Sequence, residues 1–184
     1  MMDERARTKG FTLTESLVLL ALVAILASLA FPAYQHVAQN GRATASVSNL
    51  RQLGVGLGAY LADNNNTMPI LKFARASTSD NVPVIDNTLS RYVTAPGVFA
   101  CPADVNGIAQ TTGTSYFWWT PINGQSAAHL SSLPGLQGSQ TAQLASQIPV
   151  MGDKEGFHPY LANKVNMLYA DGHATQDLIF FTGN

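Results

Sequence analysis

The chain has 184 residues and a net charge of -1, and only 11% of its residues are charged, against about 25% in an average globular protein. Its length accommodates one ordinary domain with an accessory element, and its Lys and Arg residues form no basic stripe that would neutralise phosphates, so nucleic acid is not expected as a partner. The single cysteine, Cys101, cannot close an intrachain disulfide, and the sequence offers it no companion for a zinc or Cys-x-x-Cys site.

The N-terminal segment predicts a membrane helix. Residues 1–10 are polar and partly basic, whereas the stretch from Phe11 to Tyr34 is apolar apart from a few side chains and is close to the ~20 residues that span a bilayer. Basic residues before a span favour a cytoplasmic N-terminus, so everything after residue 34 is expected to cross the membrane. A secretory signal peptide is the alternative, but the apolar run is longer than usual and is followed by Phe31-Pro32 in place of a small-residue cleavage site.

Glu15 stands at the head of this apolar run, where a carboxylate costs about 2.5–3.5 kcal/mol on insertion scales and indicates a function by default. Cleavage between Gly10 and Phe11 would expose an α-amino group at the same membrane depth. That amine could pair with Glu15 of a neighbouring chain. The alternative is a carboxylate that simply reaches back to the membrane interface.

The segment from Lys9 to Glu15, KGFTLTE, resembles the processing motif of type IV prepilins and pseudopilins. The continuation FPAYQ, residues 31–35, is similar to the helix of that family, although Thr14 and Ser16 are more polar than its usual residues. The resemblance covers roughly the first quarter of the chain. It implies that a membrane prepilin peptidase cuts after Gly10 and methylates the amine of Phe11, and that Glu15 recruits the incoming subunit.

The second part of the helix is predicted to be amphipathic, over residues 35–63. Pro32 should kink or loosen the helix before it. Apolar or small residues then recur at steps of three and four and predict one buried face: Val47, Leu50, Gly54, Leu57 and Leu61. The closely spaced Gly54, Gly56 and Gly58 follow no strand, so we expect close packing against a sheet and no phosphate loop. The cluster Asp63–Asn66 should end the helix.

The remainder, residues 64–184, is expected to be an exported globular domain with a loop-rich middle and a C-terminal sheet. The strands are predicted from β-branched and aromatic runs between turn residues: Gly97–Cys101, Ser115–Thr120, Ile148–Met151, Val165–Ala170 and His173–Phe181. Asp171-Gly172 should join the last two through a type I′ turn. The predicted fold class is therefore α+β and pilin-like, a long N-terminal helix packed on a small antiparallel sheet.

Three further strings resemble a subgroup of large pseudopilin-like proteins: Asn49–Gly54, Cys101-Pro102-Ala103-Asp104 and Ala170-Asp171-Gly172-His173. The subgroup also places a histidine at a fixed distance before Asp-Gly. His158 lies further upstream than that pattern expects.

A calcium site is conceivable because carboxylates near loops are the usual Ca²⁺ ligands. Several candidates lie close in sequence and could converge at one end of the sheet: Asp153, Glu155, His158, Asp171 and His173. Asp153 and Asp171 are the candidate Ca²⁺ ligands, with turn capping and surface hydrogen bonding as the alternative. No other cofactor is expected.

Catalytic motifs are missing from the sequence, which contains no G-x-S-x-G, HExxH or P-loop string. Cys101 precedes Pro102 in an apolar run and is expected to be a small buried hydrophobe. The chain is therefore not expected to be an enzyme.

Together these features predict a structural subunit of a type IV pilin-like filament, most specifically a type II secretion pseudopilin in the bacterial inner membrane. Its expected partners are further copies and other pilins or pseudopilins, the prepilin peptidase, an assembly platform and membrane lipid. A type IV pilus subunit is the first alternative. A monomeric membrane-anchored binding module is the second, with an aromatic patch of Tyr116, Trp118 and Trp119.

Overall fold

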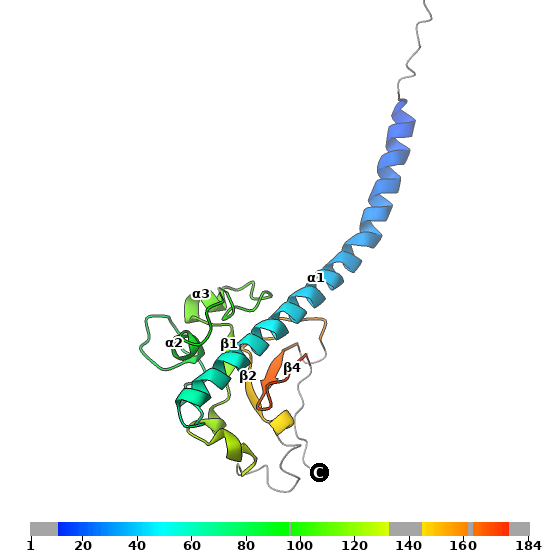
Figure 1. Cartoon of the computed structure of the whole chain (residues 1–184). Coiled ribbons are helices and arrows are strands. Elements are labelled where there is room, and N and C mark those ends of the chain that lie inside the picture. Colours follow the sequence, from blue (N-terminus) through cyan, green and yellow to red (C-terminus); the bar gives the residue numbers. More distant parts are fainter. Residues whose placement is uncertain (1–10, 96, 133–144, 162–163, 177–184) are drawn as a thin grey trace, which may run out of the picture. The chain divides into compact units, whose positions relative to one another are not determined.

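The computed structural model describes residues 11–95, 97–132, 145–161 and 164–176. It divides the chain into two compact units, Met1–Ala38 and Gln39–Asn184. The predicted leader peptide with Gly10, and the part of the last predicted strand beyond residue 176, lie outside the described residues. The described elements form an α+β fold of one long helix and a four-stranded antiparallel sheet (Figure 1).

Helix α1 runs from Leu13 to Asp63 and includes Pro32 within its helical assignment. A proline removes one backbone hydrogen bond and crowds the preceding turn; the kink expected there stays a prediction. The helix ends where the Asn cluster predicted, because Asn65 and Asn66 take φ values of 52° and 57°. Asparagine tolerates this left-handed conformation better than most residues, so it is a common terminator.

The sheet has the order β1-β2-β3-β4, with all neighbours antiparallel. Its strands are β1 (Tyr116–Trp118), β2 (Pro149–Asp153), β3 (Met167–Tyr169) and β4 (Ala174–Thr175). Tyr116 is paired with Asp153, and Gly152 with both Phe117 and Met167. Each strand falls within or overlaps a segment predicted from its β-branched and aromatic residues.

Two local predictions were wrong. The segment Gly97–Cys101 is a turn, in which Gly97 has a φ of 77° and its carbonyl accepts the amide of Ala100 at 3.0 Å. The β3–β4 hairpin forms where expected, but Gly172, with a φ of 86°, is its one residue in the left-handed region. The amide of Gly172 bonds to the carbonyl of Tyr169 at 2.9 Å. This is the pattern of a three-residue loop with a glycine bulge, which demands positive φ at one position and not at two.

In its described residues the loop-rich middle carries short helices: α2 (Ile85–Leu89), α3 (Ile108–Thr112), η1 (Thr120–Ile122), η2 (Ala127–Ser132) and η3 (Ala145–Gln147). Asp104 caps α3, because its carboxylate accepts the amides of Ile108 at 3.0 Å and Ala109 at 2.8 Å. Burial opposes ionisation of this carboxyl, but hydrogen bonds from Ser115 Oγ and these amides outweigh burial and lower the pKa of Asp104.

The core lies between the second half of α1 and the sheet. The buried helix residues start at Ala43 and recur at three- and four-residue steps: Ser46, Val47, Leu50, Leu53, Gly56 and Leu57. Four of them, Val47, Leu50, Leu53 and Leu57, share one cluster with strand residues that include Tyr116, Trp118, Met151 and Leu168. A Cβ on Gly54 would lie 3.1 Å from a methyl carbon of Leu168 in β3. The predicted close approach of a helix glycine to the sheet is confirmed there.

Gly56 and Gly58, which follow Gly54 in α1, form a matched pair for a stability test. A Cβ on Gly56 would lie 2.2 Å from Val93 Cγ2, whereas one on Gly58 meets nothing within 4 Å. Gly58→Ala should stabilise the protein by about 0.5–1 kcal/mol through helix propensity. Gly56→Ala should destabilise it by roughly 1–2 kcal/mol, because overpacking outweighs that gain. Denaturant titration of the full-length chain in mild detergent, followed by Trp fluorescence, measures the change in unfolding free energy of both variants. Equal changes in the two variants would contradict the packing argument.

Candidate functional site

The first unit presents an apolar helical surface that the described residues leave uncovered. Leu13, Leu29 and Tyr34 are 78%, 71% and 71% exposed, and the most apolar window of α1 has no buried residue. α1 is the one helix in the described ranges long and apolar enough to cross a membrane. Soluble monomers rarely expose contiguous apolar surface on this scale. This surface therefore requires lipid or other protein around it.

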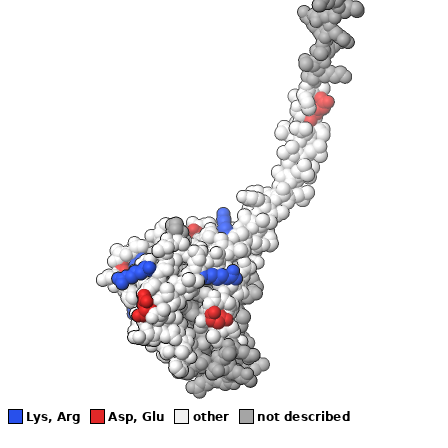
Figure 2. Space-filling model, in the orientation of Figure 1, with Lys and Arg blue, Asp and Glu red and all other residues white. Residues whose placement is uncertain are grey.

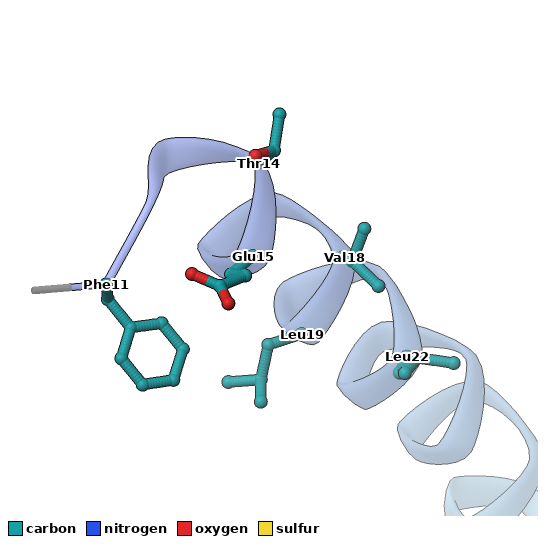
Figure 3. A pocket seen from close by; sticks show the side chains of 6 residues that line it. All are labelled: Phe11, Thr14, Glu15, Val18, Leu19 and Leu22. Carbon is teal, nitrogen blue, oxygen red and sulfur yellow. The ribbon is translucent and has the colours of Figure 1, made fainter. Parts of the chain in front are cut away.

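Glu15 is the only Asp, Glu, Lys or Arg residue among residues 11–41. In Figure 2 this part of the helix is uncoloured except for one acidic spot near its described N-terminal end. Glu15 lines a shallow groove with Phe11, Leu19 and three neighbours (Figure 3). Glu15 and Leu19 are four residues apart and share one face of the helix, and Phe11, which precedes the helix, lines the same groove.

Glu15 also caps the helix on which it stands. Its Oε2 accepts the amide of Thr12 at 2.8 Å and the hydroxyl of Thr12 at 2.7 Å, and the Thr12 hydroxyl accepts the amide of Glu15 at 3.3 Å. This is a reciprocal capping box, which satisfies two amides that a helix start leaves unbonded. The carboxylate thus has local partners that its isolation in the apolar run did not suggest. The signal was present in the Thr-x-x-Glu spacing of residues 12–15.

A second group of polar side chains lies inside the globular unit. Cys101, Asp153 and His158, which we call the Cys101 cluster, are 3%, 2% and 1% exposed, and their donor atoms all lie within 4.8 Å of one another. His158 Nε2 is 3.5 Å from Cys101 Sγ and 3.2 Å from Asp153 Oδ2. Asp153 ends β2, Cys101 precedes the loop before α3, and His158 comes from the segment between β2 and β3.

The Asp153 carboxylate joins helix to sheet. Its Oδ1 accepts the hydroxyl of Ser46 on α1 at 3.1 Å, and its Oδ2 accepts the amide of Asn166 at 2.6 Å. Ser46 is in turn 3.2 Å from the hydroxyl of Tyr116 on β1. Buried polar groups are stable only when they are bonded in this way.

The Cys101 cluster does not have the geometry of a nucleophilic relay. In such a relay the thiol and the carboxylate contact opposite nitrogens of the imidazole, whereas here both contact Nε2. Nδ1 of His158 is buried without a hydrogen-bond partner in the described part of the chain. Burial, reinforced by the charge of Asp153, raises the pKa of the Cys101 thiol to about 12. The thiolate that a nucleophile needs is therefore strongly disfavoured by the protein alone.

The two candidate Ca²⁺ ligands have separate surroundings. Asp153 belongs to the Cys101 cluster, and Asp171 does not. Asp171 is partly exposed on the β3–β4 hairpin, where its Oδ1 contacts His173 Nδ1 at 2.5 Å and accepts the His173 amide at 3.0 Å. Glu155 contacts Asn106. Only Asp153 and His158 of the five predicted residues meet within this donor group.

The aromatic run of β1 is mostly internal. Tyr116 and Trp118 are both 0% exposed, and Trp118 Nε1 donates to Asn123 Oδ1 at 2.7 Å. Trp119 is partly buried. The aromatic patch proposed for the binding-module alternative is therefore not a surface feature.

Comparisons with protein-family models, with curated proteins and with solved structures give no match to this chain.

Proposed function

We propose that this chain is a structural subunit of a type IV pilin-like filament, and most specifically a pseudopilin of type II secretion. A prepilin peptidase removes residues 1–10 and methylates Phe11. The helix from Phe11 to Tyr34 first holds the chain in the inner membrane, with the globular domain in the periplasm, and then packs against copies of itself in the filament.

The observation that carries the proposal is the uncovered apolar length of α1 with a single carboxylate at its head. A bare membrane anchor could use Glu15 as a helix cap, but a cap needs no charge, since glutamine forms the same box, and an intramembrane charge is costly. A polymerising helix has a use for the charge, because the new amine of Phe11 in a neighbouring copy supplies the counter-charge. The α+β architecture, with the second half of α1 packed on a small sheet, agrees with what the KGFTLTE resemblance implies.

Intact-protein mass spectrometry of material purified from the native host tests this processing. We expect the mass of residues 11–184 plus one methyl group on Phe11. Gly10→Val should retain the full-length mass, because a branched side chain is placed at the scissile bond. Thr14→Val, four residues away, should be processed like the parent.

An uncut and unmethylated N-terminus in the parent protein would contradict the proposal and favour a monomeric anchor. Electron microscopy of sheared cell-surface material, probed for this chain, distinguishes a pseudopilin from a pilus subunit. A pseudopilin should be missing from long surface filaments, whereas a pilus subunit should label them. The subgroup strings and the single cysteine favour the pseudopilin.

A further inference from the structure

The Cys101 cluster presents three metal-binding donor types at one buried point. A thiol sulfur, an imidazole nitrogen and a carboxylate oxygen all face each other within 4.8 Å. Cys101 lies 57 positions before His158, whereas Asp153 and His158 are close in sequence, at the end of β2 and in the segment after it, so the contact with Cys101 is a tertiary one. All three belong to the second compact unit, Gln39–Asn184.

Ordinary hydrogen bonding accounts poorly for this arrangement. His158 Nε2 carries either one proton or one lone pair, so it can serve only one of its two neighbours, Cys101 Sγ at 3.5 Å and Asp153 Oδ2 at 3.2 Å. At the same time Nδ1 of this ring, which is 1% exposed, has no partner among the described residues. Nδ1 would stay unbonded with an ion at Nε2 as well, so the crowding of two neighbours at Nε2 is the feature that hydrogen bonding leaves unexplained. A cation shared by all three donor atoms explains why two of them crowd the same nitrogen.

The two separations that involve His158 Nε2 match those of a tetrahedral site. Zn–S bonds of about 2.3 Å and Zn–N and Zn–O bonds of about 2.0–2.1 Å place sulfur and nitrogen about 3.6 Å apart, and nitrogen and oxygen about 3.3 Å apart. The corresponding separations here are 3.5 Å and 3.2 Å. The third separation, between the Cys101 sulfur and the Asp153 carboxylate, is within 4.8 Å, so the three donors already surround one point.

The surroundings also suit bound metal. The Asp153 carboxylate is held by the Asn166 amide and the Ser46 hydroxyl, and the Cys101 sulfur accepts the amide of Ala103 at 3.4 Å. Such outer contacts orient ligands and support a thiolate. A divalent ion with one thiolate, one carboxylate and one neutral imidazole has no net charge, so the buried site is electrically balanced.

We propose that Cys101, Asp153 and His158 bind one divalent transition metal ion, with Zn²⁺ as the best match to their sulfur, oxygen and nitrogen donors. Ca²⁺ is a poor match, because it takes six to eight oxygen ligands. On binding, the Cys101 thiol loses its proton to solvent and its sulfur bonds to the metal. The fourth position of a three-ligand site is usually filled by water. The ion would tie the loop before α3 and the segment after β2 to the end of the sheet.

Cobalt substitution tests the proposal, because the chain has one cysteine and any thiolate-to-cobalt absorption must come from Cys101. The full-length protein is unfolded with a chelator, refolded in mild detergent with or without Co²⁺, and checked for native Trp fluorescence. We expect one Co²⁺ per chain with a thiolate charge-transfer band and tetrahedral visible bands. Excess Zn²⁺ should displace it and raise the melting temperature of the metal-free protein.

His158→Ala should weaken Co²⁺ binding at least tenfold, and Asp171→Asn, on the exposed hairpin, should leave it unchanged. If His158→Ala does not fold, the wild-type spectrum and melting shift still decide the matter. Native-like wild-type protein without the thiolate band in excess Co²⁺ would overturn the proposal. Cobalt bound without that band would also overturn it, because the ion would then lie at another site.

Discussion

A Glu15→Gln variant should insert and lose residues 1–10 like the parent, yet its incorporation into filaments should fall by at least about tenfold. Glutamine keeps the capping box, because its side-chain oxygen can still accept the amide and hydroxyl of Thr12, which lie 2.8 and 2.7 Å from Glu15 Oε2. It removes only the negative charge. Breaking one side of a desolvated charge pair costs roughly 2–5 kcal/mol, and each 1.4 kcal/mol is about tenfold in an equilibrium.

The comparison of Glu15→Gln with Glu15→Ala separates the two roles of this residue. Glu15→Ala removes the cap as well as the charge. This variant should therefore assemble as poorly as Glu15→Gln, and the start of its helix should also fray. Thr14→Val is the matched control, since it changes an adjacent polar side chain without touching the carboxylate, and it should assemble normally. Quantitative immunoblotting of the sheared filament fraction against the membrane fraction measures all three. Filaments at parental level from the glutamine variant would remove the charge from the mechanism.

Periodicity was a good guide to the helix and its buried face. Val47, Leu50 and Leu57 were predicted to face a core and are 5%, 0% and 5% exposed. Such spacing is informative because a helix repeats its faces every 3.6 residues whatever it packs against. The position of the last hairpin could also be predicted from local sequence, because the dipeptide Asp171-Gly172 indicates a turn by itself.

The strand prediction for Gly97–Cys101 was wrong because the spacing of apolar residues does not determine the backbone conformation of a short segment. A short apolar run is compatible with a strand or with a buried turn, and here the left-handed Gly97 and the following Pro102 made it a turn. Its apolar residues still enter the core, since Val98 is 1% and Cys101 3% exposed. The sequence thus predicted burial correctly and backbone conformation incorrectly.

The Cys101 cluster could not be predicted for a different reason. Cys101 and His158 are 57 positions apart, and they meet only because the chain between them folds back through β1 and β2. Cys101 and the following Asp104 were singled out as a string without a known role. The structure gives Asp104 the role of capping α3 and places Cys101 beside the end of β2. Long-range convergence of this kind has no signature in local spacing.

Asp153→Ala should be among the most damaging substitutions in the globular unit, lowering the free energy of unfolding by about 3–5 kcal/mol even with a chelator present. The carboxylate is 2% exposed and serves Ser46, Asn166 and His158. Its removal leaves the buried Asn166 amide without its acceptor and takes one partner each from Ser46 and His158; each unsatisfied group costs about 1–3 kcal/mol, and the lost carboxylate also leaves a cavity.

Asp171→Ala is the matched control for this prediction. Asp171 also contacts a histidine, but both side chains are more than a third exposed, at 35% for Asp171 and 38% for His173. Exposed pairs of this kind contribute about 0–1 kcal/mol, so the control should lose no more than that. Denaturant titration of the full-length protein in mild detergent, followed by Trp fluorescence, measures both variants. A loss of unfolding free energy below about 1 kcal/mol for Asp153→Ala would contradict the prediction. A buried carboxylate that holds α1 to the sheet should contribute clearly more to stability than an exposed ion pair does.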